Sequence, residues 1–169
     1  PICLFWCAAG GIEAKGIWAD RDGKDGYLNV TQAKGNQPTI SVLGASGAAA
    51  GGGDVDKDGL SDIMIGAGNT DANGTDSGAA YLFLGVSLQP GEVSLSQADL
   101  KLIGSEEGDW TGRTVLALPA ADRNRRGDWA VSSSWNDTSA NNAGKVSILT
   151  GDQLWSAIKD GQSTFNLSD

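Results

Sequence analysis

A short acidic run near the middle of the chain constrains its fold more than any other feature. Asp54, Asp56, Asp58 and Asp62 stand at positions 1, 3, 5 and 9 of one segment, and Gly59 stands at position 6. Ca²⁺ takes about six to eight oxygen ligands, and alternate residues of a tight loop can turn their oxygens toward one ion. Glycine permits the sharp turn because it tolerates positive φ. The spacing therefore predicts a Ca²⁺ site, with a solvated acidic turn as the alternative.

The residues that flank this loop indicate strands rather than helices. An EF-hand would carry a bidentate glutamate at position 12, but the chain has Ile65 there. Residues 63–65 form a short apolar run that ends at Gly66, a pattern typical of a buried strand. Leu60, at position 7, would supply its backbone carbonyl to the ion. The predicted ligands are Asp54, Asp56, Asp58, Leu60 and Asp62.

Residues 54–67 resemble the FG-GAP repeat. The Asp-x-Asp-x-Asp-Gly pattern is followed by Leu-Ser-Asp-Ile-Met-Ile-Gly-Ala, although residues 66–68 read Gly-Ala-Gly where Gly-Ala-Pro is usual. Repeats of this kind form the calcium-bearing blades of the integrin α-subunit β-propeller and occur in many secreted bacterial proteins. The resemblance implies an all-β fold of β-propeller-type blades, each a four-stranded antiparallel sheet.

Internal repetition supports this interpretation. The pattern of residues 77–85 returns in residues 143–151, and Gly144 follows Gly78 by 66 residues. Such a period suits one four-stranded blade with long loops. Leu102-Ile103-Gly104, followed by residues 108–112, occupies the place of the Phe-Gly element of the family.

A second, altered copy of the acidic loop begins at Asp122, 68 residues after Asp54. In this alignment Arg126 stands at position 5 and Ala130 at position 9, so that only Asp122 and Asn124 keep ligand side chains. We expect no Ca²⁺ there, because the Arg126 guanidinium would supply the positive charge itself and pair with Asp122.

A third copy lies upstream if one residue is inserted before Asp25. Its ligands would be Asp20, Asp22, Asp25 and Asn29, and residues 40–44 would form the strand that matches residues 81–85. The alternative for this segment is a turn rich in aspartate and glycine, without an ion.

These repeats predict three units. Residues 1–44 would be a partial blade, residues 45–104 a blade with an intact calcium loop, and residues 105–169 a blade with a degenerate loop. Integrin-type propellers close into rings of about seven blades, and about two full repeats plus a partial one cannot close such a ring. The chain is then a fragment, an open stack of blades, or a subunit of an oligomeric ring. Open blade edges would favour homo-oligomers.

Composition limits the partners of the protein. The formal net charge is −9, and nucleic-acid binding needs clustered Lys and Arg, so a nucleic-acid partner is not expected. Insertion into a membrane is not expected either, because the apolar run near the amino end is too short. The high content of Gly and turn residues favours a loop-rich extracellular or cell-surface protein.

The chain contains no histidine, which excludes a Ser-His-Asp triad, a Cys-His pair and a histidine-bound metal. We therefore expect a protein that is not an enzyme. A carboxylate-dependent hydrolase remains an alternative, because paired carboxylates are abundant. Cys3 and Cys7 are the only cysteines, and the sequence leaves their redox state open.

The tryptophans allow two interpretations. They could stack on sugars from exposed loops, but packing within or between blades is the favoured role. The six are Trp6, Trp18, Trp110, Trp129, Trp135 and Trp155. Residues 152–159 are predicted to form a short helix capped by Asp152.

The sequence thus predicts an extracellular binding or adhesion module that is stabilised by Ca²⁺ and recognises a protein or glycan through its loops. A structural subunit that completes a ring or fibre is the alternative. Because one fold serves many functions, the adhesive role is implied by the family resemblance alone.

Overall fold

The computed structural model describes residues 12–19, 26–32, 40–43, 48–88, 91–118, 120, 125–137 and 139–168. Within these ranges the chain forms strands, two short 3₁₀ turns and one α-helix. The strands are β1 (Ile12–Ala19), β2 (Gly26–Gln32), β3 (Ile40–Leu43), β4 (Ala49–Gly53), β5 (Asp62–Ala67), β6 (Ala79–Phe83), β7 (Gly91–Ser94), β8 (Leu100–Ile103), β9 (Thr111–Leu118), β10 (Asp128–Ser133), β11 (Lys145–Leu149) and β12 (Thr164–Asn166). The 3₁₀ turns are η1 (Gly85–Ser87) and η2 (Leu95–Gln97), and the helix is α1 (Gly151–Lys159).

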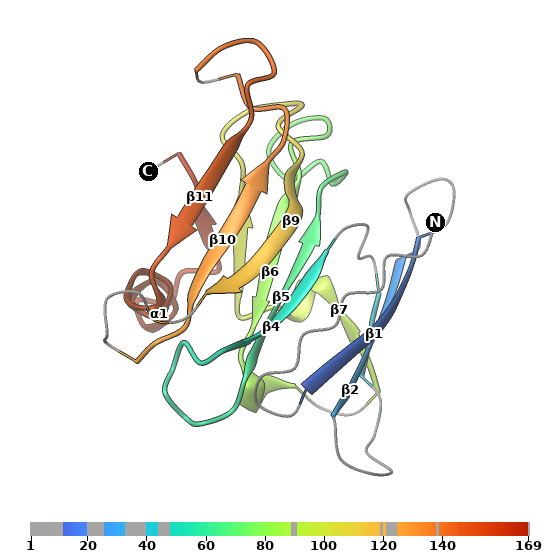
Figure 1. Cartoon of the computed structure of the whole chain (residues 1–169), viewed down its shortest axis with the longest axis vertical. Coiled ribbons are helices and arrows are strands. Elements are labelled where there is room, and N and C mark those ends of the chain that lie inside the picture. The colour runs from blue at the N-terminus through green and yellow to red at the C-terminus, as the bar shows by residue number, and fades with distance from the viewer. Residues whose placement is uncertain are drawn as a thin grey trace.

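The strands form three sheets that follow one another across the molecule (Figure 1). The N-terminal sheet has the order β1-β2-β3-β7, the central sheet β12-β8-β6-β5-β4, and the C-terminal sheet β11-β10-β9. Most neighbouring strands are antiparallel, and the exceptions are the parallel pairs β3 with β7 and β12 with β8. The antiparallel run β4-β5-β6-β8 is a four-stranded meander of the kind expected for one blade.

The central sheet is covered on both faces, and its strands are accordingly apolar on both faces. Every residue of β5 and of β6 is buried. On one face Met64 and Leu82 pack with Trp129 and Val131 of the C-terminal sheet. On the other face Ile65 and neighbouring side chains pack with β7 and the residues around it. Packing on both faces therefore holds the central sheet, and the ends of its strands where loops begin, in a defined position.

Helix α1 lies at the end of β11. Its first turn is closed by a capping box, in which the Thr150 hydroxyl accepts the Gln153 N–H and the Gln153 side chain accepts the Thr150 N–H. The short helix was predicted from the sequence, but its predicted cap was wrong. Asp152 lies inside the first turn, because Thr150, two residues earlier, supplies the capping oxygen.

The structure confirms the all-β class and the strand-rich, blade-like organisation. β3 lies where the sequence predicted a strand in residues 40–44. The boundaries of the three units at residues 44 and 104 stay a prediction. Two strands pair with a strand of another predicted unit: β7 pairs with β3 of the N-terminal sheet, and β12 pairs with β8 of the central sheet.

Candidate metal centre

The acidic loop joins β4 to β5, as the sequence predicted. It turns back on itself through two residues with positive φ, namely Lys57 at 65° and Gly59 at 87°. No heavy atom lies within 4 Å of the place where a side chain on Gly59 would begin, so the glycine serves the backbone turn rather than packing.

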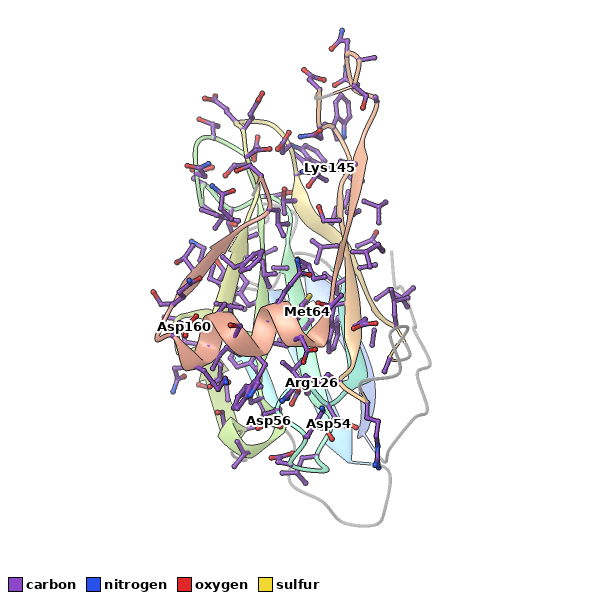
Figure 2. All side chains as sticks on the ribbon, turned by 90° about the vertical axis from the view of Figure 1, so that its left-hand side faces the viewer. Asp54, Asp56, Met64, Arg126, Lys145 and Asp160 are labelled. Carbon is purple, nitrogen blue, oxygen red and sulfur yellow. The ribbon has the colours of Figure 1, made fainter. Side chains whose placement is uncertain are left out.

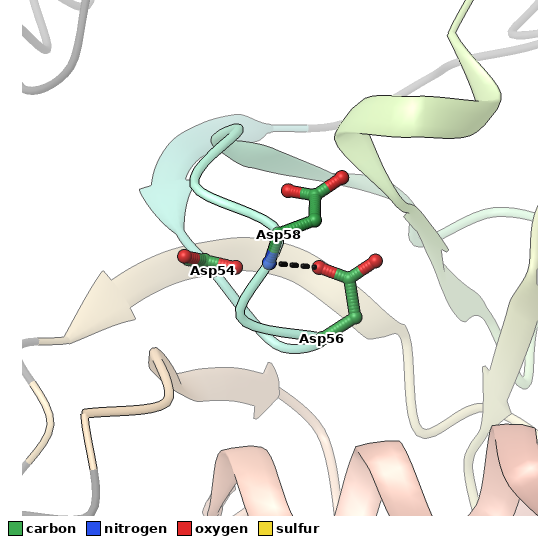
Figure 3. Close-up of side chains that lie close together, drawn as sticks. All are labelled: Asp54, Asp56 and Asp58. Carbon is green, nitrogen blue, oxygen red and sulfur yellow. Dashed lines mark hydrogen bonds between the residues drawn. The ribbon is translucent and has the colours of Figure 1, made fainter.

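Three carboxylates come together in this loop. One oxygen from each of Asp54, Asp56 and Asp58 lies within 4.8 Å of the other two (Figure 3). Backbone N–H groups hold them in place: Asp56 accepts from Asp58 at 3.2 Å, Asp54 from Gly59 at 3.2 Å, and Asp58 from Leu60 at 2.7 Å. The loop thus brings three anionic side chains close together by local hydrogen bonds.

The electrostatics of this cluster fit a cation. Asp54 Oδ1 is buried and accepts no hydrogen bond within the described structure. A buried carboxylate oxygen without a partner is costly. Burial raises the pKa of Asp56, and the charges of Asp58 and Asp54 raise it further, against the opposing Asp58 N–H. A bound Ca²⁺ would supply the missing partner and neutralise the repulsion.

Asp62 holds a different position from the other three. Its side chain is fully buried, and its two oxygens accept the N–H groups of Val55 at 2.6 Å and Gly85 at 2.9 Å. Burial raises the pKa of Asp62 to about 7, the two N–H groups oppose this shift, and the charges of Asp56 and Asp54 add to it. Asp62 therefore ties the loop to the end of β6. Its role as a ligand, and that of the Leu60 carbonyl, stay predictions.

Asp128 is the counterpart of Asp62 in the C-terminal sheet. Asp62 accepts the N–H of Gly85, and Asp128 accepts the N–H of Gly151 at 2.9 Å, with 23 residues between the partners in both cases. The alignment that placed Ala130 at position 9 is therefore wrong by two residues. Both buried aspartates accept the same kind of backbone N–H, so the second copy keeps the aspartate that stands at position 9 of the first.

Arg126 binds the intact loop of the neighbouring sheet. Its Nη1 donates a hydrogen bond to the Val55 carbonyl, and its Nε pairs with Asp152 of α1 at 2.8 Å. Its guanidinium also lies 5.4 Å from the centre of the Trp155 ring. Figure 2 shows Arg126 close to Asp54 and Asp56, beside α1. The predicted Arg126 pair with Asp122, like Asn124, lies outside the described residues.

The upstream loop stays a prediction. Asp20, Asp22 and Asp25 lie outside the described residues, and Asn29 lies in β2. Where the structure describes carboxylates, the group formed by Asp54, Asp56 and Asp58 is the one that gathers as metal ligands do.

Aromatic side chains gather at the other end of the sheets. Trp110 precedes β9, and its ring centre lies 5.7 Å from that of Trp135 in the loop after β10. Arg113 covers the Trp110 ring at 4.8 Å. Trp110 has φ 52°, which is uncommon for a bulky side chain. Trp135 is 49% exposed, whereas Trp129 is fully buried, so core packing holds for Trp129 and is wrong for Trp135.

Across the described part of the chain, helices long and apolar enough to cross a membrane are absent. A comparison with curated proteins gave no match. Residues 46–83 match the FG-GAP repeat family. This segment holds β4, the acidic loop, β5 and β6, which are the elements that form and position the carboxylate cluster. By this match, and in line with its blade-like fold, the chain carries an FG-GAP repeat over residues 46–83.

Proposed function

We propose that this protein is an extracellular binding or adhesion module whose acidic loop is held in place by Ca²⁺. The observation that carries the proposal is the gathering of Asp54, Asp56 and Asp58, together with a buried Asp54 oxygen that accepts no hydrogen bond. FG-GAP repeats often bind Ca²⁺ and are typically extracellular binding or structural modules. Extracellular calcium is abundant enough to fill a weak site.

Calcium would act on stability by linkage. An ion that binds only the folded loop stabilises the fold by RT ln(1 + [L]/Kd), or about 2.7 kcal/mol when free ion exceeds Kd about 100-fold. The loop is tied through Asp62 to Gly85 and through Val55 to Arg126. Order imposed on the loop therefore reaches both the central sheet and the C-terminal sheet.

Recognition would take place at the opposite end of the sheets, through the loops that carry Trp110 and Trp135. The half-exposed Trp135 indole lies beside Trp110, whose ring Arg113 covers, and the group offers a flat apolar surface with hydrogen-bond donors around it. Such a surface suits a sugar ring or an aromatic-rich protein patch. The positive φ of Trp110 supports this role, because strained residues concentrate at functional sites.

Thermal unfolding in excess Ca²⁺ and in chelator tests the calcium site. Wild type should show a clear rise in Tm with Ca²⁺. The Asp58→Asn variant should lose most of that rise while it keeps the hydrogen bond to the Leu60 N–H, because the amide oxygen can replace Asp58 Oδ1. The matched control is Asp71→Asn, in the loop at the opposite end. Its carboxylate also accepts a backbone N–H, that of Asp76 at 2.9 Å. If Ca²⁺ shifts no Tm, or shifts all three proteins equally, the calcium site is wrong.

A panel of immobilised glycans and extracellular-matrix proteins tests recognition. Binding should fall at least about tenfold in Trp135→Ala, because exposed aromatic anchors contribute much of an interface's affinity. The fold of this variant should be unchanged, since Trp135 is 49% exposed. Equal binding by wild type and Trp135→Ala would remove the aromatic loops from the proposal and leave the calcium site standing.

A further inference from the structure

Asp109, the residue before Trp110, is a buried carboxylate that accepts hydrogen bonds from neutral groups. It is 2% exposed. Its two oxygens accept the Asn136 side-chain amide at 3.0 and 3.1 Å, and Oδ2 also accepts the Ser105 hydroxyl at 3.2 Å and the Glu106 N–H at 3.1 Å. Burial of a carboxylate is costly unless such donors satisfy it. The position of this side chain therefore depends on the groups that donate to it.

Asn136 lies in the loop after β10, is 1% exposed and directly follows Trp135. The Trp135 N–H donates to the Asp109 carbonyl at 3.2 Å, beside the bond between the Asn136 and Asp109 side chains. The paired register of β9 and β10 ends at Thr111 and Ser133. The contacts of Asp109 thus continue the link between the two strands as far as the two indoles.

The backbone of Trp110 is also held by a different loop. Its N–H donates to the Asp76 carbonyl at 3.1 Å, and its carbonyl accepts the Arg113 N–H at 3.3 Å. Its φ of 52° is a conformation that costs a bulky residue free energy and persists only where the surroundings impose it. These bonds fix where the Trp110 ring begins, so the second indole has to be placed relative to it.

The loop after β5 is the counterpart of the loop after β10 in the first copy, and it has the same backbone turn. Thr70 and Asn136 correspond at the repeat of 66 residues. The Thr70 carbonyl accepts the Gly78 N–H at 2.8 Å, and the Asn136 carbonyl accepts the Gly144 N–H at 3.0 Å. The turn itself therefore does not require an asparagine.

The side chains of the two turns differ. The Thr70 hydroxyl donates to the Ala67 carbonyl at 2.9 Å, inside its own loop. Asn69 precedes Thr70, where the second copy has Trp135. An exposed tryptophan and an amide that crosses to the neighbouring loop thus occur together in the second copy, which favours a shared role.

We propose that Asp109 and Asn136 are positioning residues for the recognition surface formed by Trp110 and Trp135. Their contact holds the two ring centres 5.7 Å apart, with an angle of 40° between the rings, so that one ligand can contact both. Because both side chains are buried, they act through the indoles and not by touching the ligand. The inference rests on the proposed function for its ligand and adds the buried groups that determine whether the surface forms.

Circular dichroism measures the arrangement of the two indoles without any ligand, because closely placed indoles give an exciton couplet that depends on their distance and angle. Trp135→Phe identifies this signal, since it removes one of the two indoles. Asn136→Asp should lose most of the couplet, because it places a second carboxylate against Asp109. Asn136→Ala removes the amide without adding a charge, and it serves as the test if Asn136→Asp does not fold.

A double variant, Asp109→Asn with Asn136→Asp, exchanges the amide and the carboxylate. The amide nitrogen at position 109 can then donate to the carboxylate at position 136, while the amide oxygen accepts the Glu106 N–H. This variant should regain the couplet. The matched control is Thr70→Val, which removes the side-chain hydrogen bond of the corresponding turn in the first copy. Its couplet should equal that of wild type even if its Tm falls, which separates lost stability from a lost indole arrangement.

Binding to the panel of glycans and matrix proteins is measured for the same proteins, after thermal unfolding has established that each is folded. The affinity of Asn136→Asp should fall about tenfold, as expected for Trp135→Ala, and the double variant should recover it. A wild type that binds no member of the panel would remove the proposed recognition, whereas the couplet alone decides the positioning. Folded Asn136→Asp and Asn136→Ala proteins that keep the wild-type couplet would overturn the positioning role, as would an equal loss of the couplet in Thr70→Val.

Discussion

Gly53 lies directly against the indole ring of Trp129. A Cβ added to Gly53 would lie 2.6 Å from Trp129 Cζ2 and 2.9 Å from Nε1. Gly53 is the last residue of β4, immediately before the acidic loop, and Trp129 is fully buried in β10. The acidic loop thus begins at a tight contact between the central sheet and Trp129 of the C-terminal sheet.

Gly53→Ala should destabilise the protein by about 1–3 kcal/mol, because overpacking a tight contact displaces side chains or backbone. Gly51→Ala in the same strand is the control. Its Cβ would meet the Asp62 carbonyl at 3.6 Å, an ordinary contact, so stability should change by less than about 0.5 kcal/mol. Denaturant unfolding in excess Ca²⁺ measures both. Equal stability of the two variants would show that the strands adjust to a methyl group at Gly53 without cost.

Arg126→Met should destabilise the fold by about 1–3 kcal/mol, because the Val55 carbonyl loses a donor in a part-buried position. Asp152→Asn should cost only about 0–1 kcal/mol, since Asp152 is 61% exposed and solvent screens its pair with Arg126. The adjacent, exposed Arg125 provides the control Arg125→Met, which should be close to wild type. A calcium titration of the same variants measures whether the hydrogen bond from Arg126 to Val55 also affects the Ca²⁺ affinity of the acidic loop. If Arg125→Met and Arg126→Met unfold alike, the contact with Val55 contributes nothing measurable.

Stability in chelator should depend on pH through Asp62. Burial raises the pKa of Asp62 in the folded protein to about 7, against about 3.9 when unfolded. Between these values the folded state binds more protons, so the contribution of Asp62 to stability falls as pH rises from about 4 to 7. Excess Ca²⁺ should oppose this fall, because a nearby cation favours the ionised form.

The measurement is denaturant unfolding at several pH values for wild type and Asp62→Asn. The variant should be less stable at every pH, since an amide nitrogen cannot accept the second N–H. The stability difference, wild type minus variant, should shrink as pH rises in chelator. A difference that stays constant with pH would contradict the raised pKa.

The acidic loop and the strands around it could be predicted from the sequence because their signals are local. Asp54, Asp56 and Asp58 alternate along the chain, and backbone N–H groups within a few residues suffice to converge their carboxylates. The apolar residues of β5 likewise indicate a buried strand directly. The helix was found for the same reason, and its cap was misplaced only by two residues.

The sequence by itself determined the all-β class, the calcium-type loop and the approximate repeat, since each depends on spacing along a short segment. Tertiary structure decided what those residues contact. Asp62 meets Gly85 at a separation of 23 residues, and Arg126 meets Val55 at a separation of 71. Such partners depend on how sheets stack, and no periodicity in the sequence encodes that stacking. For this reason only the structure could align Asp128 with Asp62.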